Sequence, residues 1–375
     1  MLISIIQNTD PGTRSQWKMG DRENHNSEMP HSWDVNNPPP PGRKNRRGGR
    51  WLLVLLLLAL CGSLLLNVIL FAVAGLTGLT SLDSDRKVQE RFHSYQKNGR
   101  SKVAIISVTG AILEGEGFVK HQIDRALEDR SVKAVVLRVN SPGGTVTGSD
   151  YIYHHLRELA RENDIPIVVS MGGLAASGGY YVAMAAGDTP DAIFAEPSTW
   201  TGSIGVIIPH YNFSGLLEEW GVEEDSVASR PLKKMGSLAR PMTDEERQIF
   251  RGLVDESFTQ FKDIVKAGRP KFRKDPEALD RLATGQIYTA QQALNNGLID
   301  KIGFIEEAID RAIELAKLDK TDVKVVEYKR MPTLTDVLLG ANVRGEQFDL
   351  ATMLEMTAPR AYYLCTWLPP LATSW

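Results

Sequence analysis

The sequence predicts an α/β fold built on a mostly parallel β-sheet. Three apolar, mostly β-branched runs are each followed by a stretch compatible with a helix: VAIISV at 103–108, VKAVVLRV at 132–139 and PIVVSM at 166–171. Continuous apolar runs are typical of parallel strands, because helices cover both faces of such a sheet. The 375 residues are enough for one large domain or two modest ones.

Further elements follow along the chain, and one helix carries its own start signal. Thr243 and Glu246 have the spacing of a capping box, in which each side chain bonds the other residue's backbone amide, so a long amphipathic helix is expected to begin there. From the same kinds of pattern we predict strands at 192–196, 201–208 and 323–328, and helices at about 243–267 and 304–318.

The first fifty residues have the composition of a disordered segment. Pro, Gly, Asn, Ser and charged residues dominate residues 1–50, so this segment cannot bury enough apolar area to offset its chain entropy. A basic cluster ends the segment: Arg43, Lys44, Arg46, Arg47 and Arg50. Such a cluster can bind nucleic acid, but its position before an apolar stretch favours a simpler role in membrane topology.

The apolar stretch that follows predicts a membrane anchor. Residues 51–82 contain no charged side chain, and about 20 apolar residues cross a bilayer, so we predict one transmembrane helix near 51–76. Basic residues precede it and Asp83 follows it, which predicts a cytoplasmic N-terminus and an extracytoplasmic remainder. Two alternatives stay open: a signal-peptidase site at 72–74 and a poor lipoprotein box at Cys61.

The composition shifts divide the chain into five parts. We predict a disordered cytoplasmic arm at 1–50, the anchor at 51–76, a polar connector compatible with a helix at 77–100, one α/β domain at 101–330 and a C-terminal tail at 331–375.

The overall composition excludes several classes of function. The formal net charge of −3 argues against a global affinity for nucleic acid, whose signature is a strongly basic surface. The two cysteines, Cys61 and Cys365, do not suggest a disulfide framework, and no Cys/His cluster indicates zinc. There is no Walker motif, so we do not expect the protein to be driven by ATP, and we expect no metal or other cofactor.

A glycine pair follows the second predicted strand. In Asn140-Ser141-Pro142-Gly143-Gly144, two residues without side chains let backbone amides approach a ligand closely. An oxyanion hole made of backbone donors needs that geometry. Taken alone, the segment is better explained as a tight turn between a strand and a helix.

Two serines lie in similar surroundings further on. Ser177, within Gly172–Tyr181, stands where we expect an apolar helix to begin, so its hydroxyl would lie near free amides and the positive end of the helix dipole. Those features suit a nucleophile, although an ordinary N-cap serine is the simpler reading of Ser177 alone. Ser203, in Gly202-Ser203-Ile204-Gly205, either orients a base or is a turn residue.

A nucleophilic serine needs a base, and the histidines offer little. His154 and His155 have the pattern of surface residues, and His210 is the one histidine worth testing. A lysine can serve instead when it is uncharged, a form that burial favours. Lys233 and Lys234 lie in a loop before the long helix, and composition alone leaves both as solvated charges.

Several segments, in this order, closely resemble signal peptide peptidase A, a family of the Clp/crotonase fold superfamily. The matching segments are LRVNSPGG, MGGLAASGGYYVAMAA, TGSIGVI, a loop lysine and ATGQIYTAQQALNNGLIDKIG, and the resemblance covers roughly residues 101–330. It implies the Clp/crotonase-like spiral ββα fold for the peptidase domain. This sequence departs from the family's pattern at Arg230-Pro231-Leu232, where relatives usually have a glycine and an aromatic residue or histidine before the lysine.

The resemblance also implies roles for particular residues. Ser177 would be the nucleophile and Lys233 the general base, with Lys234 as the near alternative. The amides of Gly144 and Gly178 would form the oxyanion hole. Ser203 falls near a supporting position.

The resemblance further implies a location and partners. It predicts a serine endopeptidase that is anchored in the cell membrane, with its catalytic domain on the extracytoplasmic side, and that cleaves remnant signal peptides or other apolar peptides. It also predicts a ring-like homo-oligomer in which neighbours contribute Ser and Lys to shared sites. The expected partners are therefore the peptide substrate, the membrane and other copies of the chain. No nucleic acid is expected to bind.

Two other classes share the fold and stay as alternatives. A crotonase-like acyl-CoA enzyme would use paired glycine amides on a thioester and would bind adenine nucleotides. For a non-catalytic membrane scaffold, the Ser177→Ala change would have no effect on function. The apolar tail at 358–375 packs on a neighbour, touches the membrane or enters an active-site groove as a self-substrate, and we favour packing.

Overall fold

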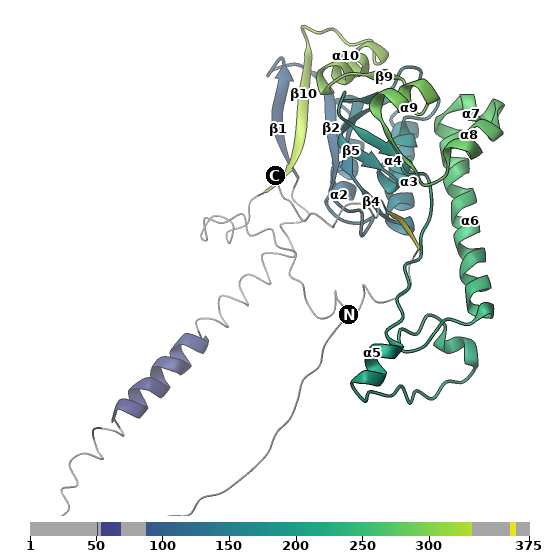
Figure 1. Ribbon diagram of the computed structural model, residues 1–375. Helices are drawn as coiled ribbons and strands as arrows, with labels where there is room; N and C mark the ends of the chain where they lie inside the picture. Colours follow the sequence, from purple (N-terminus) through teal and green to yellow (C-terminus); the bar gives the residue numbers. More distant parts are fainter. Residues whose placement is uncertain (1–50, 52–53, 69–87, 332–360, 365–375) are drawn as a thin grey trace, which may run out of the picture. The chain divides into compact units, whose positions relative to one another are not determined.

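The computed structural model describes residues 51, 54–68, 88–331 and 361–364 (Figure 1). The chain divides into two compact units, Met1–Val68 and Ile69–Trp375. In the first unit, residues 54–68 are helical. Across the residues described, none of the helices combines the length and the apolar composition that a membrane crossing requires. The predicted span at 51–76 extends beyond the described residues, and the predicted arm at 1–50 lies outside them entirely.

The second unit is built on one mixed β-sheet that is mostly parallel. Its strands follow the order β1-β10-β2-β3-β5-β6-β9, and β7 pairs with β5 and with β8. The pairs β1–β10 and β7–β8 are antiparallel, and the other pairs in this sheet are parallel. The strands are β1 (Val88–Tyr95), β2 (Ser101–Thr109), β3 (Val132–Ser141), β5 (Ile167–Ala176), β6 (Ile193–Ala195), β7 (Trp200–Gly202), β8 (Ile287–Thr289), β9 (Lys301–Ile302) and β10 (Val323–Arg330).

A second, two-stranded antiparallel sheet pairs β4 (Gly143–Thr145) with β11 (Tyr362–Leu364). The helices are α2 (Phe118–Glu128), α3 (Val146–Glu162), α4 (Gly178–Ala183), α5 (Ser214–Glu219), α6 (Asp244–Gly268), α7 (Pro270–Lys274), α8 (Pro276–Leu282), α9 (Ala290–Asn296) and α10 (Ile305–Leu315), with the 3₁₀ helices η1 (Met184–Ala186) and η2 (Pro231–Lys234).

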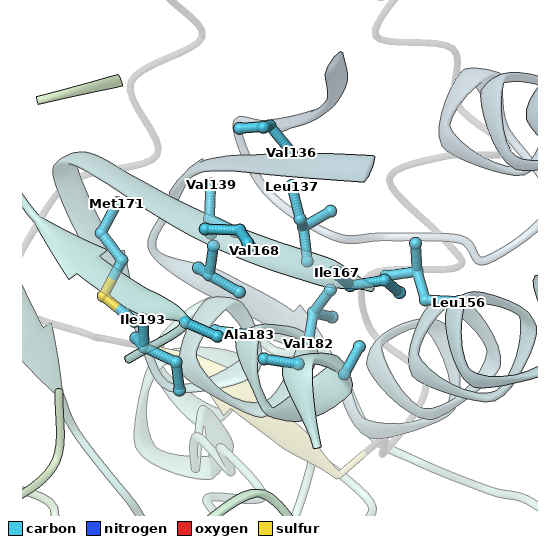
Figure 2. Close-up of a cluster of buried hydrophobic side chains, with 14 of the residues drawn as sticks. Val136, Leu137, Val139, Leu156, Ile167, Val168, Met171, Val182, Ala183 and Ile193 are labelled. Atoms are coloured by element: carbon cyan, nitrogen blue, oxygen red, sulfur yellow. The ribbon is translucent and has the colours of Figure 1, made fainter. Parts of the chain in front are cut away.

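The hydrophobic core lies where the central strands meet α3 and α4. In Figure 2, Val139 and Val168 from β3 and β5 face Val182 of α4, and Leu156 of α3 lies beside Ile167. All five side chains are at most 1% exposed. Fully burying an aliphatic side chain contributes about 1.5–3 kcal/mol, so these contacts fix α4, and the loop before it, against the sheet.

The predicted mixed α/β fold with a mostly parallel sheet is confirmed, and several elements match closely. The runs at 103–108, 132–139 and 323–328 lie within β2, β3 and β10. The predicted capping box also forms: Thr243 accepts a hydrogen bond from the amide of Glu246, whose carboxylate accepts one from the amide of Thr243.

Three local predictions were wrong. The helix-compatible connector at 77–100 contains the strand β1 in its described part. The strand expected to end near 171 continues to Ala176, so β5 leads directly to Ser177. The strand predicted at 201–208 ends at Gly202, because Gly202 and Ser203 both have positive φ angles, of 84° and 52°, which an extended strand does not accommodate.

Candidate active site

Ser177 occupies the single residue between β5 and α4. Its φ of 56° and ψ of −116° are sparsely populated for a residue with a side chain, and such strain costs about 1–3 kcal/mol. The Ser177 side chain is 1% exposed, and within the described residues its Oγ has no hydrogen-bond partner. It is therefore not the capping serine that was the simpler reading. A buried hydroxyl without a partner is costly, which points to a role outside folding.

The backbone on both sides holds Ser177 in this conformation. Its amide donates a 2.8 Å hydrogen bond to the carbonyl oxygen of Gly202, and its own carbonyl accepts a 2.9 Å hydrogen bond from the amide of Tyr181. The first of these bonds ties the start of α4 to the end of β7. The second closes the first turn of α4.

The glycine pair after β3 forms the short strand β4 beside Ser177. The Gly143 carbonyl accepts a 2.8 Å hydrogen bond from the amide of Ile112, and the Thr145 amide donates one of 2.7 Å to the Ile112 carbonyl. Polar groups of successive residues in a strand point to opposite edges. The amide of Gly144 therefore points away from Ile112, toward the other edge of β4.

The two candidate oxyanion amides lie close together because both residues lack side chains. A Cβ atom added to Gly178 would lie 3.1 Å from the backbone nitrogen of Gly144 and would collide with Oγ of Ser149. A Cβ atom added to Gly143 would lie 3.1 Å from Cβ of Ser177 and 2.6 Å from the nitrogen of Gly178. The structure thus brings Ser177, Gly144 and Gly178 to one place.

Ser203 lies one residue beyond the backbone partner of Ser177. Its side chain is 7% exposed, and its amide donates a 2.7 Å hydrogen bond to the carbonyl of Gln286. Gly202 and Ser203 together turn the chain out of β7. Ser203 therefore belongs to the same loop cluster as the nucleophile.

The structure does not bring the predicted bases to Ser177 within this chain. Lys233 is exposed and Lys234 half-buried, both in η2, in the segment between α5 and α6. In Figure 1, α5 and this segment lie beyond the N-terminal end of α6, away from β4. The ring of His210 contacts the carbonyl of Ser237 at 3.3 Å, in the same outlying region.

A strand that was not predicted from the sequence, β11, lies along β4. Tyr362 and Leu364 lie opposite Thr145 and Gly143, and the backbone of Tyr362 exchanges hydrogen bonds of 2.9 and 3.0 Å with Ile207 on its other side. We expected residues 358–375 to pack on a neighbour, but the described part, 361–364, lies on β4 of the same chain. The apolar, aromatic composition of the tail was the only signal for this contact.

One turn after Ser177, Tyr181 forms a polar contact beneath the site. Its hydroxyl donates a 2.6 Å hydrogen bond to Oδ1 of Asp150. Burial, and then this carboxylate, hold the pKa of Tyr181 well above its ordinary value. Tyr181 is therefore a neutral hydrogen-bond donor throughout the physiological pH range.

A histidine pair on α3 forms the one group in the described residues with metal-ligand spacing. His154, His155 and Glu158 each offer a ligand atom, all within 4.8 Å of one another. Nδ1 of His155 already lies 2.8 Å from Oε2 of Glu158, and His154 is exposed. The group contains neither Ser177 nor a residue in contact with it.

Comparisons with known proteins identify the family of the chain. The model described as peptidase family S49 matches residues 159–319, and the one described as Clp protease matches 106–198. A signal peptide peptidase SppA of Enterococcus faecium is 36% identical over 297 residues, covering 73% of this chain and 83% of the relative. The chain belongs to peptidase family S49. It is a serine peptidase.

Two further relatives are longer than the region that they share with this chain. Protease 4 of Salmonella typhi is 36% identical over 265 residues, which cover 68% of this chain and 41% of that protein. The chloroplastic serine protease SPPA of Arabidopsis thaliana is 31% identical over 274 residues, covering 68% of this chain and 39% of the relative. The S49 match in this peptidase includes both Ser177 and Lys233.

Proposed function

We propose that this peptidase cleaves peptides with Ser177 as nucleophile and the amides of Gly144 and Gly178 as the oxyanion hole. The observation that carries the proposal is the buried Oγ of Ser177, which has no hydrogen-bond partner in the described part of the chain and lies beside the amides of two glycines. A base takes the Ser177 proton while Oγ attacks the peptide carbonyl, and the amides stabilise the oxyanion. The proton passes to the leaving amine, and water then hydrolyses the acyl-enzyme.

In this proposal a substrate binds as an added strand on the edge of β4 that faces away from Ile112, in the place that β11 takes in this structure. The amide of Gly144 points toward that edge, and β11 already pairs there in antiparallel register. Main-chain hydrogen bonds of this kind hold an extended peptide whatever its sequence, while side-chain pockets select among sequences. This geometry suits an endopeptidase.

The base in the proposal is Lys233, supplied by a neighbouring copy of the chain, with Lys234 as the alternative. Lys233 is exposed in the single chain, and an uncharged amine needs burial. Its segment carries exposed apolar side chains that a second copy would cover. They are Tyr211, Phe213, Leu216, Trp220, Val222, Val227 and Leu232. Ser203 would orient the incoming amine, and the assembly is a homo-oligomer with shared sites.

The nucleophile is tested by reaction of the full chain with a fluorophosphonate probe. Wild type is labelled, Ser177→Ala is not, and the exposed control Ser198→Ala is labelled like wild type. Labelling that survives the Ser177→Ala change would refute the nucleophile. Such labelling would place the reactive nucleophile at another residue.

The base and its origin are tested by mixing two inactive variants. Lys233→Ala alone loses labelling, whereas Lys234→Ala keeps it. Co-expression of Ser177→Ala with Lys233→Ala chains restores part of the labelling, because a neighbour with Lys233 then serves a chain with Ser177. If labelling is lost in Lys234→Ala and kept in Lys233→Ala, Lys234 is the base. If co-expression restores nothing, the shared site is wrong.

We further propose an anchored, extracytoplasmic peptidase domain that cleaves remnant signal peptides or other apolar peptides. The support is the uncharged stretch at 51–82 after a basic cluster, together with the resemblance of 101–330 to the spiral ββα fold. Carbonate extraction and protease accessibility of spheroplasts test this proposal. It predicts that the full chain stays in the membrane fraction and that residues 101–330 are digested from outside. A chain released by carbonate would contradict the anchor.

A further inference from the structure

Lys233 lies on η2, in a long stretch of chain that contributes nothing to the hydrophobic core. Residues 207–245, all within the described part of the chain, are exposed or half-buried, and the next buried residue is Glu246 in the first turn of α6. A general base must be held within hydrogen-bond reach of the proton that it removes. Polar contacts, rather than a core, therefore have to fix the position of η2.

Arg240 ties η2 to the start of α6. Its Nη2 donates a 3.0 Å hydrogen bond to the carbonyl oxygen of Lys234, the last residue of η2. The same carbonyl accepts a 3.1 Å hydrogen bond from the amide of Ser237. A carbonyl oxygen has two lone pairs, so these two bonds use its full capacity and fix the C-terminal end of η2.

The Arg240 guanidinium is itself held by Glu246. Nη1 donates a 3.1 Å hydrogen bond to Oε2 of Glu246, and Nη2 donates one to Oε1. The Glu246 side chain is 3% exposed, and its Oε2 also accepts a hydrogen bond from the amide of Thr243 in the capping box. The hydrogen bond from Arg240 is the main cause that holds the pKa of Glu246 below its ordinary value, so both partners are charged at neutral pH.

The two lysines of η2 have different surroundings. Lys234 is half-buried and lines a cleft together with Glu224 and Arg240. Hydrogen bonds from two serines, followed by the charge of Lys234, lower the pKa of Glu224. Lys233 is exposed. The fixed η2 thus turns Lys234 toward a carboxylate of its own chain and leaves Lys233 available to a neighbouring copy.

We infer that Arg240 is the positioning residue for the base: held by Glu246, it fixes η2 so that Lys233 reaches the serine of a neighbouring copy. The inference rests on the proposed function, in which the Lys233 amine takes the proton of Ser177. Arg240 acts through the backbone of η2 and does not itself touch the substrate. Because a displacement of about 1 Å in a catalytic group can reduce a rate about 100-fold, a loosely held η2 is enough to slow the reaction.

The first test compares Arg240→Lys with wild type in fluorophosphonate labelling of the full chain. A lysine keeps a positive charge beside the buried Glu246, but it lacks the planar fork that bonds this carboxylate and the Lys234 carbonyl together. We expect the rate of labelling to fall about tenfold to 100-fold, while the assembly keeps its mass in detergent. Arg251→Lys is the matched control, because Arg251 is 77% exposed on α6 and pairs with Asp255 at 3.3 Å. It should be labelled like wild type.

The second test places the same substitution on one or the other of two co-expressed chains. The first chain carries Ser177→Ala and supplies Lys233, and the second carries Lys233→Ala and supplies Ser177. Arg240→Lys on the first chain should slow the labelling of the second as much as in the uniform assembly, because the η2 that serves the reactive serine is no longer fixed. The same substitution on the second chain should leave labelling unchanged, because the η2 of that chain supplies no base.

These two arrangements separate positioning from stability, because each contains the substitution in one of its two chains. An equal loss of labelling in both, or no loss in either, overturns the positioning role of Arg240 and leaves the proposed function standing. Co-expressed chains that are not labelled even with Arg240 intact remove the shared site, and the inference with it.

Discussion

The backbone amide of Ser177 donates a 2.8 Å hydrogen bond to the carbonyl of Gly202. The bond thus joins the residue that follows β5 to the last residue of β7, and these two strands are parallel neighbours in the sheet. Because the loops after parallel neighbours lie at the same sheet edge, this bond places Ser203 close to the nucleophile. The site is consequently sensitive to changes in glycines that never touch a substrate.

Gly202→Ala should disturb the nucleophile through its backbone. The residue has a φ of 84°, and an added Cβ atom would lie 2.6 Å from Cδ2 of Tyr288. Left-handed backbone costs an alanine about 1–2 kcal/mol before any clash. We expect a comparable loss in the free energy of unfolding by urea and slower probe labelling. Gly215→Ala is the control, because an added Cβ atom there meets nothing within 4 Å. It should keep the wild-type free energy of unfolding and the wild-type rate of probe labelling.

Gly178→Ala should block the oxyanion hole even when the fold is rescued. The new methyl group would collide with Oγ of Ser149 and lie 3.1 Å from the nitrogen of Gly144. We expect probe labelling to fall by about 100-fold or more, the usual effect of losing an oxyanion donor. Adding Ser149→Ala removes the colliding oxygen and restores part of the stability. Labelling that returns together with stability would show that the amide of Gly144 is not involved.

The strands that were predicted are those whose burial leaves a local signal. β2 and β3 are covered on both faces, so their sequences are continuous apolar runs. β1 was missed because its inward positions include Glu90, which pairs with Lys102 at 2.9 Å instead of adding an apolar residue to the alternation. β11 has three residues and is held by its pairing with β4 and with Ile207, which no local pattern encodes.

The candidate site was predictable in its residues more than in its geometry. The resemblance to signal peptide peptidase A, which the glycine-rich loops carry, implied roles for Ser177, Gly144 and Gly178; taken alone, the loops favoured a tight turn and a capping serine. The positive φ of Ser177 and the contact of β11 with β4 depend on long-range packing. The Ser–Lys pairing stays a prediction, since Lys233 is exposed in a separate segment of this chain.

Acid should destabilise the sheet through Asp129. Burial raises the pKa of this carboxyl, but hydrogen bonds from Lys102 at 2.7 Å and from Ser131 outweigh it and lower the pKa to about 2. The resulting stabilisation is complete above the unfolded value of 3.8 and is lost as pH falls through about 2. We expect wild type to lose up to about 2 kcal/mol more than Asp129→Asn between pH 6 and pH 2.

Urea unfolding at pH 6, 4, 3 and 2 measures this difference. Asp225→Asn, a change in an exposed carboxylate, is the control and should follow the wild-type curve. If Asp129→Asn is also parallel to wild type over this range, Asp129 and Lys102 do not contribute pH-dependent stability.

Trp220→Glu should disperse the assembly and, with it, the activity. Trp220 is 71% exposed and Val227 fully exposed on the segment that carries Lys233. Large apolar side chains gathered on one segment mark an interaction surface. A carboxylate there prevents burial against a second copy, so Lys233 no longer reaches a neighbour's serine. We expect the mass in detergent to fall to that of a monomer and probe labelling to fall at least about tenfold, because a general base contributes that much or more.

Phe304→Glu is the matched control for this prediction. Phe304 is 50% exposed and precedes α10, which Figure 1 shows at the opposite end of the second unit from α5. This variant should keep both the mass and the labelling of wild type. A Trp220→Glu chain that stays assembled and labelled would mean that the segment faces solvent. Lys233 would then lack the burial that an uncharged amine requires, and the search for the base would return to residues nearer β7.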